Sequence, residues 1–117
     1  KDVALEDRKL HLVFELMQSN AQKLLNMKST DLNVECRIKM ILYDALKGLE
    51  AIHSAGFAHC NIKPAHLFIK DTDSKVCIGD LSCCVDKYAK FKPKYVGTKF
   101  YKAPEILLGS TSYTEKC

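Results

Sequence analysis

Apolar residues recur at steps of three and four along the middle of the chain. The series runs through Val34, Ile38, Ile41, Leu42, Ala45, Leu49 and Ile52. This spacing places the apolar side chains on one face, so it predicts one long amphipathic helix. Asn33 is the expected N-cap, with Glu35 in the first turn, and Gly56 is the expected stop. Such a stripe is typical of core helices in most folds and indicates no activity.

The segments on either side of this helix have the patterns of short strands. Alternating apolar residues around the polar stretch 6–9 predict a β-hairpin near the start of the chain, and residues 21–27 predict a short helix. After the long helix, residues 67–69 and 76–78 predict two strands joined by a turn at 71–74, a segment rich in residues that hydrogen-bond their own backbone. The expected class is therefore α+β.

Composition narrows the range of partners. A chain of 117 residues can bury one modest core. The net charge of +4 is mild, and the basic residues are dispersed rather than gathered on a face with stacking aromatics, so no nucleic-acid partner is predicted. No apolar run is long enough to span a bilayer, and the start at Lys1-Asp2 has no signal-peptide pattern. We expect an intracellular protein, cytoplasmic or nuclear, with no membrane partner.

Six cysteines are dispersed along the chain: Cys36, Cys60, Cys77, Cys83, Cys84 and Cys117. They form no Cys-x-x-Cys pair, and the adjacent Cys83 and Cys84 cannot easily bridge each other. Because no secretory context is visible either, the sequence predicts free thiols.

The most specific motif lies at 57–69, Phe-Ala-His-Cys-Asn-Ile-Lys-Pro-Ala-His-Leu-Phe-Ile. It resembles the catalytic loop His-Arg-Asp-Leu-x-x-x-x-Asn of eukaryotic protein kinases. In that family the Asp accepts the proton of the substrate hydroxyl, and the Asn holds a magnesium ion. Here Asn61 stands at the base position and His66 at the metal position.

Further kinase landmarks follow in the family's order. Residues 78–82, Ile-Gly-Asp-Leu-Ser, resemble the Asp-Phe-Gly metal motif, and 101–105, Tyr-Lys-Ala-Pro-Glu, resemble the Ala-Pro-Glu anchor of the activation segment. Upstream, residues 10–17 resemble the fifth strand and the hinge. Residues 96–109 are most similar to the CMGC branch, which holds the cyclin-dependent, MAP and male-germ-cell-associated kinases.

The resemblance implies a partial protein-kinase-like fold over residues 1–117. Residues 1–19 would supply small-lobe strands and the hinge, and residues 20–117 the start of the large lobe, the catalytic loop and the activation segment. The family's Gly-rich loop, strand-three Lys and later large-lobe helices are not among these residues. We therefore expect the chain to be a fragment of a kinase domain.

The resemblance also assigns roles to individual residues. Asp80 stands at a magnesium-ligand position, whereas His66 brings an imidazole that suits other metals better. Asn61 is too weakly basic to act as a general base, and Lys63 stands where Ser/Thr kinases place a Lys near the γ-phosphate. A metal cluster of His59, Cys60, His66 and Cys77 is the alternative, but the family's loop His packs against the core.

Half of an ATP site is readable by the same resemblance. Glu15 and Met17 would offer backbone groups to the purine, Phe14 would be the gatekeeper and Phe68 the floor. The cofactors that the resemblance implies are ATP and magnesium, and we expect the binding of both to be weak or lost. Cys60 replaces the Arg that reads an activation-loop phosphate, and Pro93 replaces the phosphorylated Thr of MAP kinases.

Three functions remain open from the sequence. The first is a pseudokinase that keeps an ATP-site remnant and acts by binding or scaffolding a protein partner, with little or no phosphotransfer. The second is an active or weakly active ATP-dependent Ser/Thr kinase of the CMGC type, with a protein substrate. The third is a truncated fragment without function.

Overall fold

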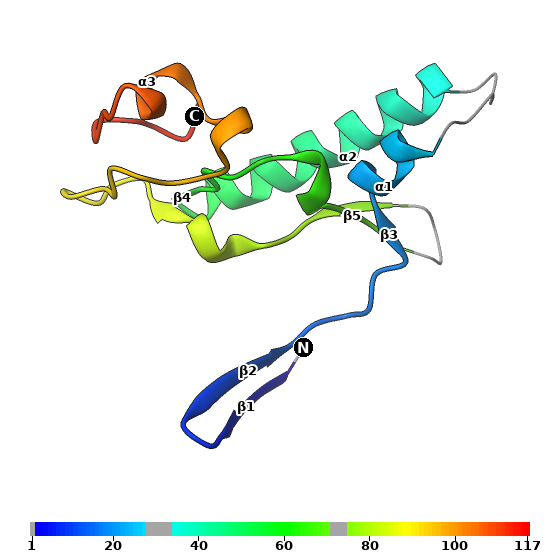
Figure 1. The fold of residues 1–117 in the computed structure, drawn as a ribbon, viewed down its shortest axis with the longest axis horizontal. Helices are drawn as coiled ribbons and strands as arrows, with labels where there is room; N and C mark the ends of the chain where they lie inside the picture. Colours follow the sequence, from blue (N-terminus) through cyan, green and yellow to red (C-terminus); the bar gives the residue numbers. More distant parts are fainter. Residues whose placement is uncertain (1, 28–33, 71–74) are drawn as a thin grey trace.

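The computed structural model describes residues 2–27, 34–70 and 75–117. Figure 1 shows a body built around one long helix, with a separate hairpin projecting from it near the N-terminus. The hairpin pairs β1 (Asp2–Glu6) with β2 (Lys9–Val13) in antiparallel register, and its ten residues are exposed. The predicted hairpin is confirmed.

The long helix α2 (Val34–Ser54) is also confirmed. It packs on β6 (Val76–Ile78) so closely that a Cβ added to Gly48 would lie 3.0 Å from Ile78 Cδ1. Asp44 on the same helix accepts a hydrogen bond from the backbone N–H of Val76 at 2.9 Å. The chain leaves the helix through Gly56, whose φ of +89° suits glycine. The predicted N-cap Asn33 and the predicted turn 71–74 lie outside the described residues.

A three-stranded sheet lies beside α2. β5 (Leu67–Ile69) occupies its centre, between β3 (Ser19–Asn20) and β6, and both pairings are antiparallel. The short helix α1 (Ala21–Asn26) follows β3 directly, and the side chain of Asn20 caps it by accepting from the backbone N–H of Lys23. The first core cluster joins these elements through Ala21, Ala45, Leu67, Ile69 and Val76.

A second core cluster lies at the other end of α2. It gathers Ala58, Cys60, Val85, Val96, Ile106 and Tyr113, with Cys117 packed against it. β4 (Phe57–Ala58) pairs here with β7 (Val85–Asp86), and the short helix α3 (Pro104–Leu107) contributes Ile106 to the cluster. The short helical turns are η1 (Pro64–His66), η2 (Leu81–Cys83) and η3 (Lys99–Tyr101).

Only part of the apolar stripe on α2 is buried. Ala45 is buried and Ile41 packs on the first cluster, but Val34, Ile38 and Leu42 are exposed. Among the described elements the helix packs mainly on β6 and β4, and part of the stripe lies outside these contacts.

Candidate functional site

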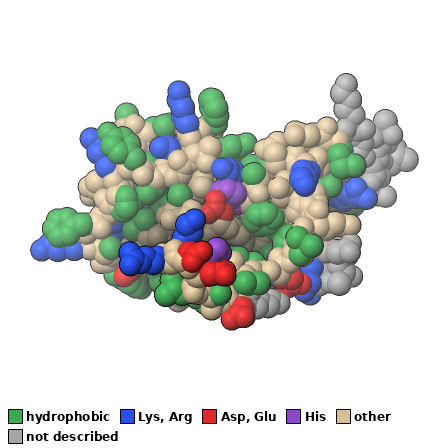
Figure 2. All heavy atoms as spheres, turned by 60° about the horizontal axis from the view of Figure 1, so that its bottom comes forward, with side chains coloured by type: hydrophobic (Ala, Val, Ile, Leu, Met, Phe, Trp, Pro, Cys, Tyr) green, Lys and Arg blue, Asp and Glu red, His purple; other side chains and the backbone are tan. Residues whose placement is uncertain are grey.

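The pairing of β5 with β6 brings two polar loops together. Leu67, the first residue of β5, lies opposite Ile78, the last residue of β6. The loop that precedes β5 therefore ends beside the loop that follows β6, and the backbone N–H of Gly79 donates to the carbonyl of His66 at 2.9 Å. Figure 2 shows histidine side chains (purple) beside acidic and basic ones near the middle of one face.

His66 contacts Asp80 directly. Its Nε2 lies 3.0 Å from Asp80 Oδ2, and its Nδ1 lies 2.9 Å from the backbone carbonyl oxygen of Asn61. A carbonyl can only accept, and so can an ionised carboxylate. Both contacts are hydrogen bonds only when the imidazole carries a proton on each nitrogen, which is its cationic form.

Asp80 is held as a carboxylate by its local turn. The hydroxyl of Ser82 donates to Asp80 Oδ1 at 2.6 Å, and this bond is the main cause that lowers the pKa of Asp80. Burial is the next-largest effect and opposes this lowering, whereas the backbone N–H of Ser82 and the nearby His66 and Lys63 lower the pKa further. Asp80 itself adopts a left-handed backbone conformation with φ of 54°. Both oxygens of the carboxylate therefore accept from protein donors.

Asn61 is tied to the segment before the Ala-Pro-Glu motif. Its Oδ1 accepts from the backbone N–H of Thr98 at 3.0 Å and from the Thr98 hydroxyl at 2.8 Å. Lys63 Nζ in turn donates to Thr98 Oγ1 at 2.9 Å. Asn61 is buried, so this network connects two stretches that are far apart in the sequence at a site with little access to water.

His59 packs inside the molecule, as its family position implied. Its side chain is 2 % exposed, its Nε2 donates to the carbonyl of Gly79 at 3.1 Å, and its Nδ1 accepts from the N–H of Asn61 at 3.2 Å. Burial is the main cause that lowers the pKa of His59, and the hydrogen bond to Gly79 partly offsets it. His59 thus joins the two loops as a neutral ring.

A cavity of about 880 Å³ opens between the segment after β2 and the loop after β6. It includes the four residues assigned to the nucleotide by resemblance, namely Phe14, Glu15, Met17 and Phe68, together with Asp80. Phe68 forms part of its wall against Gly79, where an added Cβ would lie 2.5 Å from the ring. Glu15 pairs with Lys70 across the cavity's edge at 2.9 Å. Phe14 is 76 % exposed. The volume is that of a small-molecule site.

The donor set does not fit a magnesium ion. Magnesium prefers oxygen ligands in octahedral geometry, but both Asp80 oxygens are engaged and the second position presents an imidazole. Over the described ranges, no three His, Cys, Asp or Glu side chains are arranged to hold a metal ion.

Sequence reasoning missed several members of this site. The sequence assigned no role to Thr98 or to the Ser82 hydroxyl. Leu81, within the segment that resembles the metal motif, is exposed and lines the cavity. The only feature of the sequence at this point is a Thr beside Gly97 in a loop, and such a pair does not indicate which residue the Thr contacts.

Comparison with known proteins identifies the family of this chain. The family model described as the protein kinase domain matches residues 1–117. The chain belongs to the protein kinase family. Its curated relatives include extracellular signal-regulated kinase 2 of Dictyostelium discoideum, 34% identical over 117 residues and 93% of this chain. Mitogen-activated protein kinase 2 of Arabidopsis thaliana is 32% identical over 119 residues and 97% of this chain. These relatives confirm the kinship with the CMGC branch.

The protein kinase fold is confirmed independently by a solved structure. The structure titled as the yeast RNA Pol II CTD kinase CTDK-1 complex matches 99% of this chain and 38% of its own, with a TM-score of 0.84 at 24% identity. This kinase-family chain spans 31% of the length of both curated relatives. Within its described residues, no helix is both long and apolar enough to cross a membrane.

Proposed function

We propose that this chain is part of a pseudokinase, a kinase-like module that keeps a nucleotide pocket, transfers little or no phosphate and acts by binding a protein partner. The observation that carries the proposal is the double hydrogen bond from Thr98 to the side-chain oxygen of Asn61. The group at the base position is an amide whose oxygen is already occupied by two structural donors.

The chemistry of Asn61 supports the loss of phosphotransfer. An amide oxygen is far too weakly basic to take a hydroxyl proton, and here it serves as an anchor for the segment that carries Thr98. General-base assistance typically contributes about 10²–10⁴ in rate. Loss of that assistance alone leaves a slow enzyme, so the metal position decides whether any activity survives.

The contact between His66 and Asp80 supports the loss of the metal. Charge neutralisation by magnesium supplies much of phosphoryl-transfer catalysis. In this site the Asp80 carboxylate faces the His66 imidazole, whose Nε2 lies 3.0 Å from Oδ2. A magnesium ion would have to displace this imidazole from the carboxylate oxygen.

The cavity supports retained nucleotide binding. We propose that Glu15 and Met17 meet the purine through backbone groups, that Phe14 and Phe68 enclose it, and that Lys63 faces the phosphate end. In this proposal residues 1–19 belong to the small lobe and hinge and residues 20–117 to the large lobe. The binding of ATP then needs no magnesium.

An active CMGC kinase is the second candidate. The relatives are named as MAP kinases, and Lys63 keeps a fixed position through Thr98. A module with intact positioning can retain residual transfer. A truncated, non-functional fragment is the third candidate, and the exposed apolar residues of α2 are compatible with it.

Thermal unfolding of the protein at its natural length, with ATP in the presence and absence of magnesium, separates these candidates. If the protein is a pseudokinase, ATP should raise its unfolding temperature by the same amount with and without magnesium. At about 100 times the dissociation constant this stabilisation is roughly 2.7 kcal/mol. His66→Asn is the matched variant, and it should make the rise magnesium-dependent.

Other outcomes contradict the proposal. A magnesium-dependent rise in the parent protein would favour the active kinase. A cooperative unfolding transition whose midpoint ATP does not shift would show that the cavity does not bind ATP. The absence of a cooperative transition would favour the non-functional fragment.

A further inference from the structure

Two cysteines from distant parts of the chain meet in the second core cluster. Cys60, in the loop that follows β4, lies with its Sγ 3.7 Å from the Sγ of Cys117. All six cysteines are free thiols in the structure. A disulfide has an S–S length of about 2.05 Å, so the two sulfurs need to approach by roughly 1.7 Å.

The surroundings of Cys60 hold it in place. Its Sγ also points at the carbonyl of Ala58, 3.6 Å away, and its side chain is buried among Val85, Val96 and Ile106. The residue has a φ of 60°, and its carbonyl lies so close to Gly97 that a Cβ there would be 2.5 Å from the oxygen. Any approach of the two sulfurs must come from Cys117.

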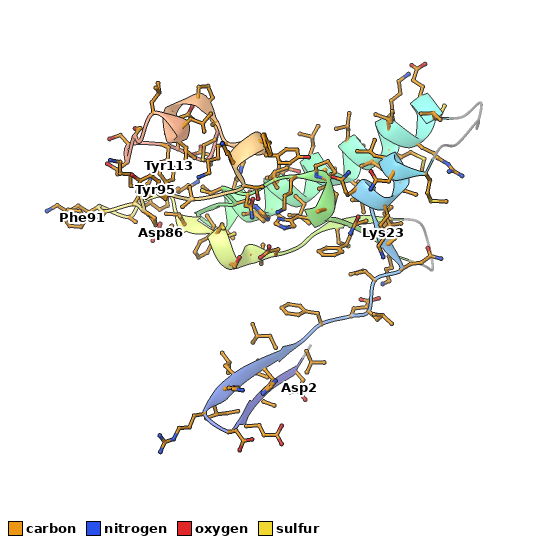
Figure 3. The ribbon with its side chains drawn as sticks, in the orientation of Figure 1. Asp2, Lys23, Asp86, Phe91, Tyr95 and Tyr113 are labelled. Carbon is orange, nitrogen blue, oxygen red and sulfur yellow. The ribbon has the colours of Figure 1, made fainter. Side chains whose placement is uncertain are left out.

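Cys117 is the more accessible of the two cysteines. It is half-buried, and its backbone N–H makes a long bond of 3.4 Å to the carbonyl of Thr114. The neighbouring Tyr113 is anchored, because its hydroxyl donates to the carbonyl of Pro93 at 2.9 Å and its own carbonyl accepts from Lys92 at 2.7 Å. Figure 3 shows Tyr113 beside the loop that carries Tyr95, whereas Phe91 points away at the loop's tip.

We propose that Cys60 and Cys117 form a reversible disulfide when the protein meets a peroxide, and that this bond fastens the catalytic-loop region to the segment after α3. The inference rests on the contact between the sulfurs and does not depend on whether the protein transfers phosphate. It assigns a modification site to a pair of residues that no kinase role explains.

The order of the chemistry follows from the two environments. The contact with Cys60 is the main cause that lowers the pKa of Cys117, with Lys92 adding to the effect, whereas that same contact and burial raise the pKa of Cys60. The Cys117 thiolate attacks hydrogen peroxide, becomes a sulfenic acid and releases hydroxide, which a proton converts to water. The Cys60 sulfur then attacks the sulfur of the Cys117 sulfenic acid and forms the disulfide. The thiol proton of Cys60 leaves with the displaced hydroxide as a second water. Hydrogen peroxide is reduced, and the two thiols are oxidised.

Oxidation would close a loop that contains the polar contacts between the catalytic-loop region and the segment before η3. Asn61, Asp80 and Thr98 all lie between the two cysteines in the sequence. The bond would therefore limit the movement of the segment that Asn61 and Lys63 hold through Thr98. Intracellular disulfides of this kind are usually transient and redox-sensing.

Peptide mapping of the natural-length protein tests the proposal. The reduced protein is treated with hydrogen peroxide, free thiols are blocked with N-ethylmaleimide, and digested peptides are analysed by mass spectrometry. We expect a peptide pair that links Cys60 to Cys117 and is released by dithiothreitol. Cys36→Ser, an exposed change on α2, should leave the link intact, and Cys117→Ser should abolish it.

A second readout covers the effect on structure. Peroxide should slow amide hydrogen exchange in residues 92–117 of the parent protein and of Cys36→Ser, but not of Cys117→Ser. The proposal is overturned if peroxide oxidises Cys36 while Cys60 stays unlinked, or if Cys60 links instead to Cys83 or Cys84. Formation of the link without slower exchange would overturn the proposed fastening.

Discussion

Thr98 donates twice to one oxygen atom of Asn61, from its backbone N–H at 3.0 Å and from its hydroxyl at 2.8 Å. The two residues are 37 positions apart, and the bonds join the loop after β4 to the segment before η3. Asn61 is therefore a structural clamp between these two segments. Four predictions test this clamp and its surroundings.

Thr98→Val should weaken the clamp. The substitution removes the hydroxyl that donates to Asn61 and accepts from Lys63, while it keeps the side-chain volume. Loss of hydrogen bonds at a part-buried site typically costs about 1–3 kcal/mol, to be measured as the free energy of unfolding in urea. Thr111→Val, an exposed change of the same kind, should cost less than about 0.5 kcal/mol. Equal effects of the two variants would show that the clamp contributes nothing.

Gly97→Ala should be more destabilising than Gly56→Ala. Both glycines have positive φ, +74° and +89°, which costs another residue about 1–2 kcal/mol. At Gly97 the new Cβ would also meet the carbonyl oxygen of Cys60 at 2.5 Å, whereas at Gly56 it would meet only a ring atom of Tyr88 at 3.6 Å. Overpacking adds about 1–3 kcal/mol. Similar unfolding free energies for the two variants would exclude the close approach.

The protein should lose stability as the pH falls below 6.5. Burial lowers the pKa of His59 below its ordinary 6.5, and His66 adds to this against the opposing effects of Gly79 and Asp80. Below pH 6.5 the unfolded state therefore binds a proton that folded His59 resists, and the loss continues down to the folded pKa. One such group contributes a slope of at most about 1.4 kcal/mol per pH unit.

The matched pair for this slope is His59→Phe and His11→Phe. The first variant should be less stable at neutral pH but should unfold with a flatter pH dependence. His11 lies exposed on β2, so its replacement should keep the parent's slope. An unchanged slope in His59→Phe would show that His59 does not carry the effect.

Ser82→Ala should raise the pKa of Asp80 toward its ordinary 3.8. The Ser82 hydroxyl is the first cause of the lowered value, and the backbone and His66 effects remain in the variant. Asp80 stabilises the folded state above the unfolded pKa, and this contribution is lost as the pH falls through the lower folded value. Carbon NMR of the Asp80 carboxyl measures its pKa in the parent protein and in Ser82→Ala. An unchanged pKa in the variant would show that the Ser82 hydroxyl is not the cause of the lowered value.

The sequence predicted the parts of this site that depend on local pattern. The period of the apolar stripe predicted α2, and short apolar runs predicted β5 and β6, because these patterns follow from the geometry of one element. The two-residue strands β4 and β7 carry no such pattern and were not predicted. The motif resemblance assigned Asn61, His66 and Asp80 to a catalytic loop and a metal motif, and these assignments stay predictions.

Contacts between distant side chains were beyond the sequence. Asp80 was interpreted as a retained magnesium-ligand position and His66 as a degenerate one, but nothing in the motif indicated that the two side chains contact each other. The link from Asn61 to Thr98 and the approach of Cys60 to Cys117 depend on how β4, β7 and α3 pack. These contacts are set by the fold as a whole and not by any one segment.

The most direct test of the account is phosphotransfer from labelled ATP by the natural-length protein and by its Asn61→Asp/His66→Asn double variant. The two changes restore a carboxylate base and an amide metal ligand. We predict no transfer above background by the parent and, with magnesium, clear transfer by the double variant. Magnesium-dependent transfer by the parent, abolished by Asp80→Asn, would contradict the pseudokinase proposal.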